Sequence, residues 1–425
     1  MLKAFVTLTE RTDTMASQNR HSGIILSQIV FSFLTISVSH GQNVKPDYEN
    51  LNLTDLGYKI ENTICLNISG SDFENIKAVT GKKISVKAKL LIINGDTLNP
   101  EKIVTRGQTT LMYRRKSYSF DLQSEASFHH GEITKKYKRF FLLGLSMDRN
   151  YTTNRLAFEM MGTSGIFHLF YAFCELRING RSEGICMVVE RPEDWAMKKK
   201  NSPLLIRRGY ENTIDKLKAD KQTDKEIIKK YKGNFGQIYQ SLNKYKGEEL
   251  YNAISTWLDT EEYMKWLAFN FFVRNGDYTD EVYFYVDPDS KKFRIIPWDY
   301  DDMFSMAPHE GYQESRKLIG DKLFFSTEDI LDKKIVTDPY LYKMYLVQFE
   351  KLMNELSPDV LKSIFEKTYA EIYPYYSNDE IISQSKYDRY KNDNLEGLKN
   401  NMLTLYDQLV ISRRVFLISI SNQNH

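Results

Sequence analysis

The stretch from Asp259 to Asp302 constrains the fold of this chain most, because it combines strong signals for a helix, a tight turn and a hairpin. Asp259 followed three residues later by Glu262 has the spacing of a capping box, which predicts the start of a helix. Asn275-Gly276 predicts the end of this helix, since glycine tolerates the left-handed conformation needed there. Asp277 is therefore expected in a tight loop directly after the helix.

A β-hairpin is expected next. Apolar runs at 283–286 and 292–296 flank the turn Asp287-Pro288-Asp289-Ser290, and Pro297 ends the second strand. Two antiparallel strands go out and come back, so Asp299 should return to the end of the hairpin where Asp277 lies. The sequence therefore predicts that carboxylates from a loop and from a strand end lie close together.

An acidic cluster, Trp298-Asp299-Tyr300-Asp301-Asp302, ends this stretch. Carboxylates held near one another repel and need a cation or a proton to coexist. Mg²⁺ or Mn²⁺ supplies this compensation, since hard cations prefer carboxylate oxygens and leave coordination sites for phosphate oxygens. The alternative is a solvated turn or a helix cap, which acidic clusters in loops usually form.

Composition bounds the partners of the chain. Its 425 residues suggest two domains or lobes, and the 13% aromatic residues supply large side chains for their cores. The 58 basic and 56 acidic residues leave a formal net charge of +2, which gives no overall field to attract nucleic acid or an anionic membrane. A nucleic-acid partner is therefore not expected.

Residues 23–38 form an apolar run that is followed by the small residues Ser39 and Gly41. This pattern predicts a signal peptide over residues 1–41, with Met15 as a possible true start. A permanent anchor is the alternative, but the run contains polar residues and is shorter than the roughly 20 apolar residues that span a bilayer. We expect export to the periplasm, the cell surface or the medium, with no integral membrane domain after signal removal.

Three cysteines, Cys65, Cys174 and Cys186, are too few for a disulfide scaffold or a cysteine-based zinc site. Cys174 and Cys186 flank an Asn179-Gly180 turn and could face each other across a hairpin. Two interpretations stay open, one disulfide bridge or two buried free thiols.

Hydrophobic patterning divides the rest of the chain into three segments. Residues 42–79 are expected as a lead-in segment. Residues 80–194 alternate strands and turns, with one inserted helix between Asp148 and Gly162, and are expected to form a β-rich lobe. Residues 195–425 have a mostly helical pattern and end in a helix from Asn394 to about Ile420. The fold class is therefore α+β. Strands are expected at 84–93, 117–122, 139–143, 172–177 and 184–189.

Several short motifs occur in a definite order. The most specific is Trp298-Asp299-Tyr300-Asp301, preceded by Asn275-Gly276-Asp277 and the aromatic strand Tyr283-Phe284-Tyr285. Supporting motifs are Thr105-Arg106-Gly107, Arg115-Lys116-Ser117-Tyr118, Asn154-Arg155-Leu156-Ala157, and Leu176-Arg177-Ile178-Asn179-Gly180 leading to Gly184 and Glu190. In this order they resemble the CotH kinase family, atypical secreted or spore-coat protein kinases, over roughly residues 80 to 420.

The resemblance implies a reduced, two-lobed protein-kinase-like fold. Residues 80–194 would form the β-rich N-lobe, and residues 195–425 the helical C-lobe with the catalytic loop and the metal-binding segment. It also implies transfer of the γ-phosphoryl group of ATP, with Mg²⁺ or Mn²⁺, to Ser or Thr of secreted or surface proteins. This chemistry consists mainly of positioning and charge neutralisation.

By the same resemblance, the acidic residues have separate roles. Asp277 is the catalytic-loop aspartate, which orients the acceptor hydroxyl and takes its proton, although a helix-terminating turn is the alternative. Asp299 holds the metal against the nucleotide phosphates, and Asp301 is a second ligand or orients the first. The role of Asp302 is less defined.

The resemblance also assigns nucleotide contacts. Lys116 is the candidate for the lysine that contacts phosphates, with Arg115 as its competitor and a surface cation as the alternative. Glu159 would pair with that lysine, and Glu190 would meet the nucleotide base where a kinase hinge runs. Arg106-Gly107 would belong to a turn that covers the phosphates.

The chain departs from the family pattern at Val282, where an asparagine would help to bind a second metal ion. Either Asp280 or Glu281 replaces it, or the protein binds metal weakly and acts as a pseudokinase. The rival hypotheses are a surface binding or adhesion protein without catalysis and, more weakly, a carbohydrate-associated surface protein. The sequence has no Gly-x-Gly-x-x-Gly loop and no Gly-x-Ser-x-Gly elbow, and its histidines form no evident metal site.

Overall fold

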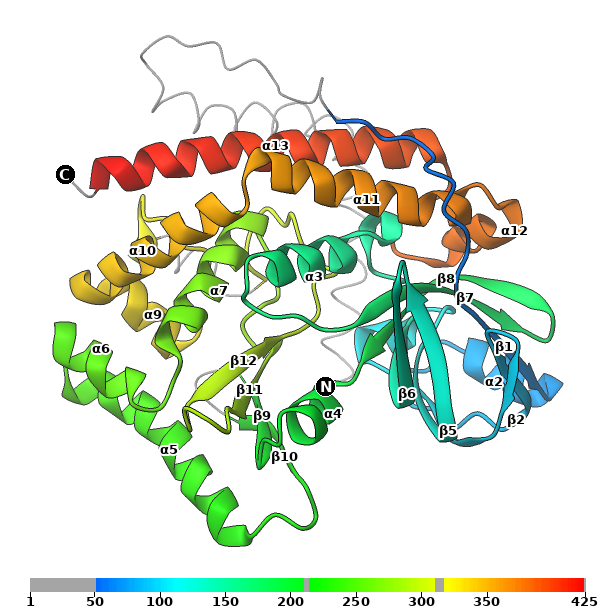
Figure 1. Cartoon of the computed structure of the whole chain (residues 1–425), viewed down its shortest axis with the longest axis horizontal. Coiled ribbons are helices and arrows are strands. Elements are labelled where there is room, and N and C mark those ends of the chain that lie inside the picture. Colours follow the sequence, from blue (N-terminus) through cyan, green and yellow to red (C-terminus); the bar gives the residue numbers. More distant parts are fainter. Residues whose placement is uncertain (1–50, 210–213, 310–316, 424–425) are drawn as a thin grey trace, which may run out of the picture. The chain divides into compact units, whose positions relative to one another are not determined.

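The computed structural model describes residues 51–209, 214–309 and 317–423 (Figure 1). The predicted signal peptide, residues 1–41, and the start of the lead-in segment lie outside the described residues. In the described part of the chain, no helix is both long and apolar enough to cross a bilayer. The described residues form a mixed α+β fold with a large sheet and a smaller one.

The larger sheet has eight strands in the order β3-β2-β1-β7-β8-β6-β5-β4. Within this sheet β1 and β7 run parallel, and every other pair of neighbouring strands is antiparallel. The predicted strands up to residue 194 are all present. They are β1 (Thr63–Ile68), β2 (Ala88–Ile93), β3 (Asp96–Leu98), β4 (Pro100–Arg106), β5 (Ser117–His130), β6 (Ile133–Leu143), β7 (Tyr171–Ile178) and β8 (Arg181–Glu190).

The lead-in segment predicted for residues 42–79 contains a strand of the sheet. β1 lies between β2 and β7, and it is followed by the helix α2 (Gly70–Lys77). Ile64, Leu66 and Ile68 of β1 are buried, which is the alternation of a half-buried strand. The folded region therefore begins before residue 80, within the segment expected as a lead-in.

The alternation of side chains along β5 separates a core face from an open face. Tyr118, Phe120 and Leu122 are buried in the core of the large sheet, as their spacing predicts. Successive side chains of a strand point to opposite faces, so Ser117, Ser119 and Asp121 are directed the other way. This second face contributes to the cavity described below.

The smaller sheet has the order β10-β9-β11-β12. Its strands are β9 (Leu204–Arg208), β10 (Ile214–Ala219), β11 (Val282–Val286) and β12 (Phe293–Pro297). The hairpin of β11 and β12 is present as predicted, with Val282 opposite Pro297. β9 and β10 were not among the predicted strands, because residues 195–425 were expected to be mostly helical. β9 is a short apolar run and β10 is a charged strand at the sheet edge, and neither has a strong periodic pattern.

The helices are α3 (Thr153–Thr163), α4 (Pro192–Asp194), α5 (Lys225–Lys244), α6 (Gly247–Ser255), α7 (Thr260–Val273), α9 (Ile330–Thr337), α10 (Pro339–Glu355), α11 (Pro358–Tyr376), α12 (Asp379–Ile382) and α13 (Leu395–Gln423). The long helices α11 and α13 run side by side (Figure 1). α13 confirms the helix predicted from Asn394 to about Ile420, and its Leu398, Met402, Leu405 and Leu409 are buried. α3, the predicted inserted helix, packs against α11.

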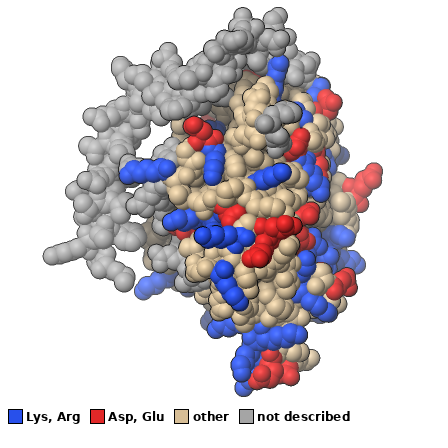
Figure 2. Space-filling model, turned by 90° about the vertical axis from the view of Figure 1, so that its left-hand side faces the viewer, with Lys and Arg blue, Asp and Glu red and all other residues tan. Residues whose placement is uncertain are grey.

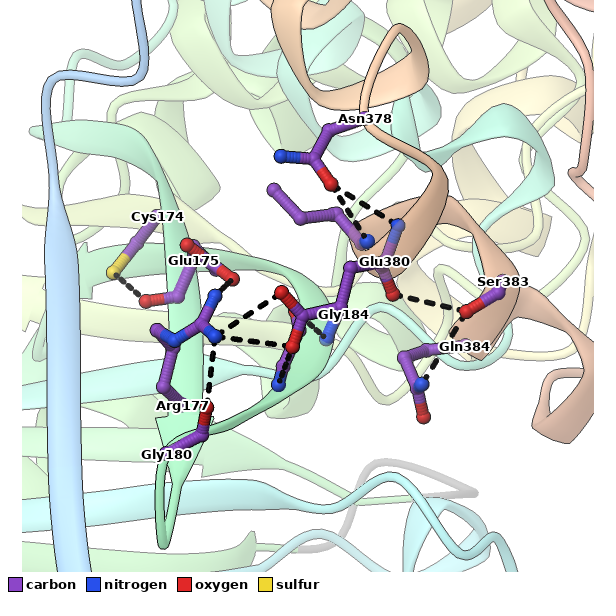
Figure 3. A network of polar contacts seen from close by, with 11 residues as sticks. Cys174, Glu175, Arg177, Gly180, Gly184, Asn378, Glu380, Ser383 and Gln384 are labelled. Atoms are coloured by element: carbon purple, nitrogen blue, oxygen red, sulfur yellow. Dashed lines mark hydrogen bonds and ion pairs between the residues drawn. The ribbon is translucent and has the colours of Figure 1, made fainter.

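The hairpin of β7 and β8 is attached to α12 by a polar network (Figure 3). Arg177 Nη2 donates to the Gly180 carbonyl at 2.8 Å and to Glu380 Oε1 at 3.0 Å. The Ser182 N–H also donates to Glu380 Oε1 at 3.0 Å, and Arg177 Nη1 donates to Glu175 Oε1 at 2.7 Å. The large sheet is thus linked to the helical part of the chain at this hairpin.

Cys174 and Cys186 lie directly opposite each other in the register of β7 and β8. Both are buried free thiols, which agrees with the second interpretation of the sequence, two free thiols, and not with a disulfide bridge. Burial raises the pKa of Cys186 to about 11. Such a thiol carries little thiolate near neutral pH and is poorly reactive.

Charged side chains of both signs are interspersed on the face of the molecule shown in Figure 2. Opposite charges that are interspersed on a surface largely cancel, so the face in view carries no strong field of one sign.

Candidate active site

A cavity of about 790 Å³ lies where the two sheets and α3 approach one another. The large sheet contributes the β4 end with the turn after it, part of β5 and the end of β6. The smaller sheet contributes β9, β10 and the loops on either side of the β11–β12 hairpin. The cavity is large enough for a nucleotide-sized ligand.

The start of α7 agrees with the sequence. The Asp259 carboxylate accepts a hydrogen bond from the Glu262 N–H at 3.2 Å. The Glu262 carboxylate does not complete the capping box, because it accepts from Arg294 Nε at 2.6 Å and from the Ile295 N–H at 3.0 Å. Glu262 therefore ties α7 to β12, and this fixes the hairpin relative to the helix that precedes Asp277.

The end of α7 differs from the prediction. The left-handed residue is Arg274, with φ 51°, and not Gly276. Gly276 is needed for a different reason, since a Cβ atom there would lie 2.0 Å from Oδ2 of Asp302. Asp277 follows in the loop as predicted, and it lines the cavity with its side chain 39% exposed.

Asp299 lies directly after β12 in a left-handed backbone conformation, with φ 55°. This conformation is uncommon outside glycine and is best tolerated by Asn and Asp. On one side the Trp298 N–H donates to the Glu281 carbonyl at 2.9 Å, and on the other the Tyr300 N–H donates to Asn154 Oδ1 of α3 at 3.0 Å. These two anchors hold Asp299 at the cavity, which Asp301 and Asp277 also line.

Three carboxylates of the cavity have raised pKa values. Burial raises the pKa of Asp299 to about 6, with the Asp277 charge adding to the shift and Arg106 opposing it. Burial and the charge of Asp299 raise the pKa of Asp301 and of Glu281 well above their ordinary values. The cluster therefore favours any bound cation, since a cation removes the cost of keeping these groups ionised together.

The donor set of the cavity fits a magnesium or manganese ion that is shared with a ligand. Among the described residues, no group of three or more His, Cys, Asp or Glu side chains is arranged to hold a metal ion by itself. Mg²⁺ is commonly bound by one or two carboxylates, with phosphate oxygens and waters completing its shell. Asp299 and Asp301 are suitable for this, and Asp280 lines the same cavity.

Arg106 and Arg207 bring positive charge close to the acidic cluster, in addition to Arg191 and four lysines that also line the cavity. The Arg106 guanidinium lies 3.8 Å from the centroid of the Phe141 ring and 5.7 Å from that of Trp298, and burial lowers its pKa. Arg207 of β9 donates from Nη2 to Glu281 Oε1 at 2.5 Å and to Asp280 Oδ2 at 3.4 Å. Arg106 was predicted, whereas Arg207 was not, because β9 itself was not predicted.

His309 is a further cavity residue that the sequence did not indicate. Its Nε2 atom lies 2.8 Å from Oδ2 of Asp302, and its Nδ1 atom lies 3.5 Å from Oδ1 of Asp277. These two carboxylates raise the pKa of His309 to about 10. His309 belongs to an irregular segment, where no periodic pattern relates it to Asp277.

A family model described as CotH kinase protein matches residues 103–404, which is more than half of the chain. The chain belongs to the CotH kinase family. The resemblance found in the motifs is thereby confirmed. No curated protein matches the chain.

Two solved structures are similar to the chain at low sequence identity. One is the Helicobacter pylori proinflammatory kinase CtkA, at 11% identity and a TM-score of 0.31, with 71% of this chain and 95% of that chain covered. The other is a Shewanella oneidensis MR-1 complex of the toxin–antitoxin system HipA and HipB with operator DNA. It matches at 12% identity and a TM-score of 0.29, with 81% of this chain and 66% of that chain covered.

The phosphate contacts that the CotH pattern suggested for Lys116 and Arg115 need correction. Lys116 is buried, and its Nζ atom donates to the carbonyls of Leu111 at 2.6 Å and Ala78 at 3.1 Å. Arg115 is buried in an ion pair with Asp388. Neither side chain lines the cavity. Lys116 has the same parity as Tyr118 along the strand, so the alternation pattern itself directs it toward the core face.

Glu159 and Glu190 also lie elsewhere than predicted. Glu159 accepts from the Tyr171 hydroxyl at 2.5 Å and lies 3.7 Å from Arg155, and it makes no ion pair with Lys116. Glu190 is buried 3.6 Å from Lys199. Neither lines the cavity, although Arg191 and Glu193, which follow Glu190, do.

The departure at Val282 has a structural explanation. Val282 is the first residue of β11, and its side chain is fully buried in the core. Asp280 and Glu281, which precede it, line the cavity. Asp280 and Glu281, and not residue 282, are thus the residues of this segment that bring oxygen atoms to the cavity.

Proposed function

We propose that this chain is an ATP-dependent protein kinase with a two-lobed, kinase-like arrangement, which transfers the γ-phosphoryl group to Ser or Thr hydroxyls of a protein acceptor. The observation that carries the proposal is that Asp277, from the loop after α7, lines one cavity with Asp299 and Asp301, from the segment after β12. Membership of the CotH kinase family supports the same reaction class.

Asp277 is suited to act on the acceptor. It lies in a loop at the cavity with a partly exposed carboxylate, so an incoming hydroxyl can reach it. In the transfer, the hydroxyl oxygen forms a bond to the γ-phosphorus, the bond from that phosphorus to the bridging oxygen breaks, and ADP leaves. Asp277 orients the hydroxyl and accepts its proton.

The remaining cavity residues are suited to bind the nucleotide. Asp299 and Asp301 would hold Mg²⁺ or Mn²⁺, with Asp280 as a further oxygen donor, and the ion would neutralise charge on the β- and γ-phosphates. Arg106 would contact the phosphates in the role assigned by sequence to Lys116, beside the turn at Gly107. The apolar part of the lining, suited to a base, comprises Val104, Leu143, Leu145, Met147 and Phe158.

The proposed setting is outside the cytoplasmic membrane. The apolar run at 23–38, with small residues after it, supports a cleaved export signal. The acceptor would then be a secreted or surface protein, in the periplasm, at the cell surface or in the medium.

The test is phosphate incorporation from labelled ATP by the full chain, with and without Mg²⁺ or Mn²⁺, into itself and into a generic protein acceptor. Asp277→Asn and Asp299→Asn should each lower it strongly, by about 100-fold or more. Asp289→Asn is the matched control, because Asp289 is an exposed carboxylate in the turn of the same hairpin. Undiminished transfer by both cavity variants would refute the proposed site.

A second candidate function is a surface protein that binds nucleotide without transferring phosphate. It is favoured by the position of Lys116, which is buried away from the cavity, and by Val282, which lies in the core. Thermal stabilisation by ATP and Mg²⁺ without any phosphate incorporation would identify this alternative.

A further inference from the structure

The segment after the acidic cluster folds back onto the loop that carries Asp277. The Phe304 N–H donates to the Val273 carbonyl at 2.9 Å, and the Ser305 N–H donates to the Arg274 carbonyl at 3.0 Å. Further along, the His309 N–H donates to the Gly276 carbonyl at 2.9 Å. The backbone of His309 is therefore fixed directly beside Asp277.

Asp302 also contacts the loop that carries Asp277. The Gly276 N–H donates to the Asp302 carbonyl at 3.1 Å, and any Cβ atom at position 276 would lie 2.0 Å from Asp302 Oδ2. Only glycine permits this close approach. The Asp302 carboxylate is mostly buried, with its side chain 14% exposed, so its direction is well defined.

The His309 ring lies between two carboxylates. Nε2 is 2.8 Å from Asp302, and Nδ1 is 3.5 Å from Asp277. An ionised carboxylate can only accept hydrogen bonds, so both ring nitrogens must carry protons for both contacts to be favourable. His309 is then an imidazolium, in agreement with its pKa, which the two carboxylates raise to about 10.

We propose that His309, anchored by Asp302, is a positioning residue that orients the carboxylate of Asp277 toward the acceptor hydroxyl. The proposal rests on the proposed function and extends it. Among the described residues, His309 supplies the one ion pair of the Asp277 carboxylate. Phosphoryl transfer depends mainly on positioning, and a misplacement of about 1 Å can cost about 100-fold in rate.

A competing role for the same contact is masking, in which His309 covers Asp277 and must leave before the acceptor binds. The two roles predict opposite signs. Removal of a positioning residue lowers the rate of transfer, whereas removal of a masking residue raises it.

The first measurement is steady-state kinetics with the full chain. His309→Ala should lower kcat about 10- to 100-fold with little change in KM for ATP, because the nucleotide contacts are elsewhere in the cavity. Asp302→Asn should also lower kcat. The kcat of the double variant should be no lower than that of the less active single variant, since both residues act through one contact. His309→Gln, which keeps one donor, should recover part of the loss.

His129→Ala is the matched control for these variants. His129 is a histidine of the β5 end whose Nδ1 contacts Thr134 Oγ1 at 3.0 Å, and it does not line the cavity. It should leave kcat unchanged. A kcat that rises in His309→Ala would overturn the positioning role in favour of masking.

The second measurement does not depend on transfer. The ring resonances of the seven histidines can be followed against pH by nuclear magnetic resonance, with His309 assigned from its loss in His309→Gln. The pKa of His309 should lie above the usual 6.5 and fall in both Asp277→Asn and Asp302→Asn. An ordinary pKa, unchanged in both variants, would overturn the proposal. A wild-type chain that keeps the raised pKa but transfers no phosphate would refute the proposed function while supporting the contact.

Discussion

Two largely buried carboxylates in this molecule lie near arginine, and yet their pKa values are shifted in opposite directions. Glu371 of α11 accepts from Arg155 Nε at 2.9 Å and from its Nη2 at 3.0 Å, and Arg155 and His130 help to lower the pKa of Glu371 to about 2. At the cavity, Asp299 has Arg106 nearby, but burial and Asp277 raise its pKa to about 6.

The difference lies in how each group is compensated. Glu371 makes a two-point contact with Arg155 between α3 and α11 and lies 3.2 Å from His130 Nε2, so its charge is compensated within the fold. At the cavity, Asp299 and Asp301 lie close to other carboxylates, and among the described residues neither makes an ion pair, so a ligand or metal can supply the compensation. Carboxylates without a paired cation thus distinguish the candidate active site from charge pairs that serve only the fold.

The largest expected effect is on transfer. Asp277→Asn should lower the rate of phosphate transfer about 10²- to 10⁴-fold, the usual contribution of a general base. It should leave the melting temperature nearly unchanged or higher, since it removes one of several repelling charges. Kinetics and thermal melting on the same preparation check both parts, and a large loss of stability would mean that Asp277 serves the fold.

The opposite result is expected for the pair between α3 and α11. Glu371→Gln should lower the free energy of unfolding by about 3 kcal/mol, because the buried Arg155 would lose its two-point ionic partner and keep only the longer contact with Glu159 at 3.7 Å. Denaturant unfolding measures this change. A variant as stable as the wild type would show that the pair contributes little, and the contrast with the cavity would then fail.

The pH dependence of this pair follows from the lowered pKa of Glu371. Its stabilising contribution is present above the ordinary value of 4.5 and is lost as the pH falls toward about 2. The stability difference between the wild type and Glu371→Gln should therefore be constant near neutral pH and shrink below about 4.5.

An effect of intermediate size is expected when a basic residue of the cavity, Arg106, is compared with a basic residue of the core, Lys116. Arg106→Ala should weaken nucleotide binding by about 1.5–3 kcal/mol, or at least about tenfold in Kd, because a charge-assisted contact to phosphate is lost. Lys116→Met should leave this Kd unchanged and lower only stability. Isothermal titration with ADP and Mg²⁺ makes the comparison. Weaker binding in the Lys116 variant alone would restore the assignment made from the sequence.

The smallest effect is expected on metal binding. Asp299 has a folded-state pKa of about 6, above its ordinary 3.8, so protonation favours the metal-free folded chain as the pH falls through about 6. The same proton competes with a cation. Thermal stabilisation by Mg²⁺ should therefore be clear at pH 7.5 and reduced at pH 5, whereas a shift that is equal at both would argue against a carboxylate site.

The sequence was most informative where the site depends on neighbouring residues. The positions of Asp277, Asp299 and Asp301 follow from one helix, one turn and one hairpin, whose signals are local. The left-handed residue at the end of α7 was misplaced, because Arg274 adopts a conformation that its residue type does not favour.

Residues whose place depends on distant pairing could not be found in this way. Arg207 reaches the cavity because β9 pairs with β11, and His309 reaches it because its segment binds the loop at Gly276. Lys116 is a different case. The alternation of the strand already places residue 116 on the core side with Tyr118, but the family motif suggested a phosphate contact for it.

The position of β1 has a practical consequence for preparing this protein. The matched family region begins at residue 103, yet β1 lies between β2 and β7 within the large sheet. A shortened chain that starts at the family boundary would leave β7 with an open edge of unpaired N–H and carbonyl groups, which invites self-association through strand pairing. Deletion series intended for crystallisation or enzyme assays should therefore keep the chain from before Thr63.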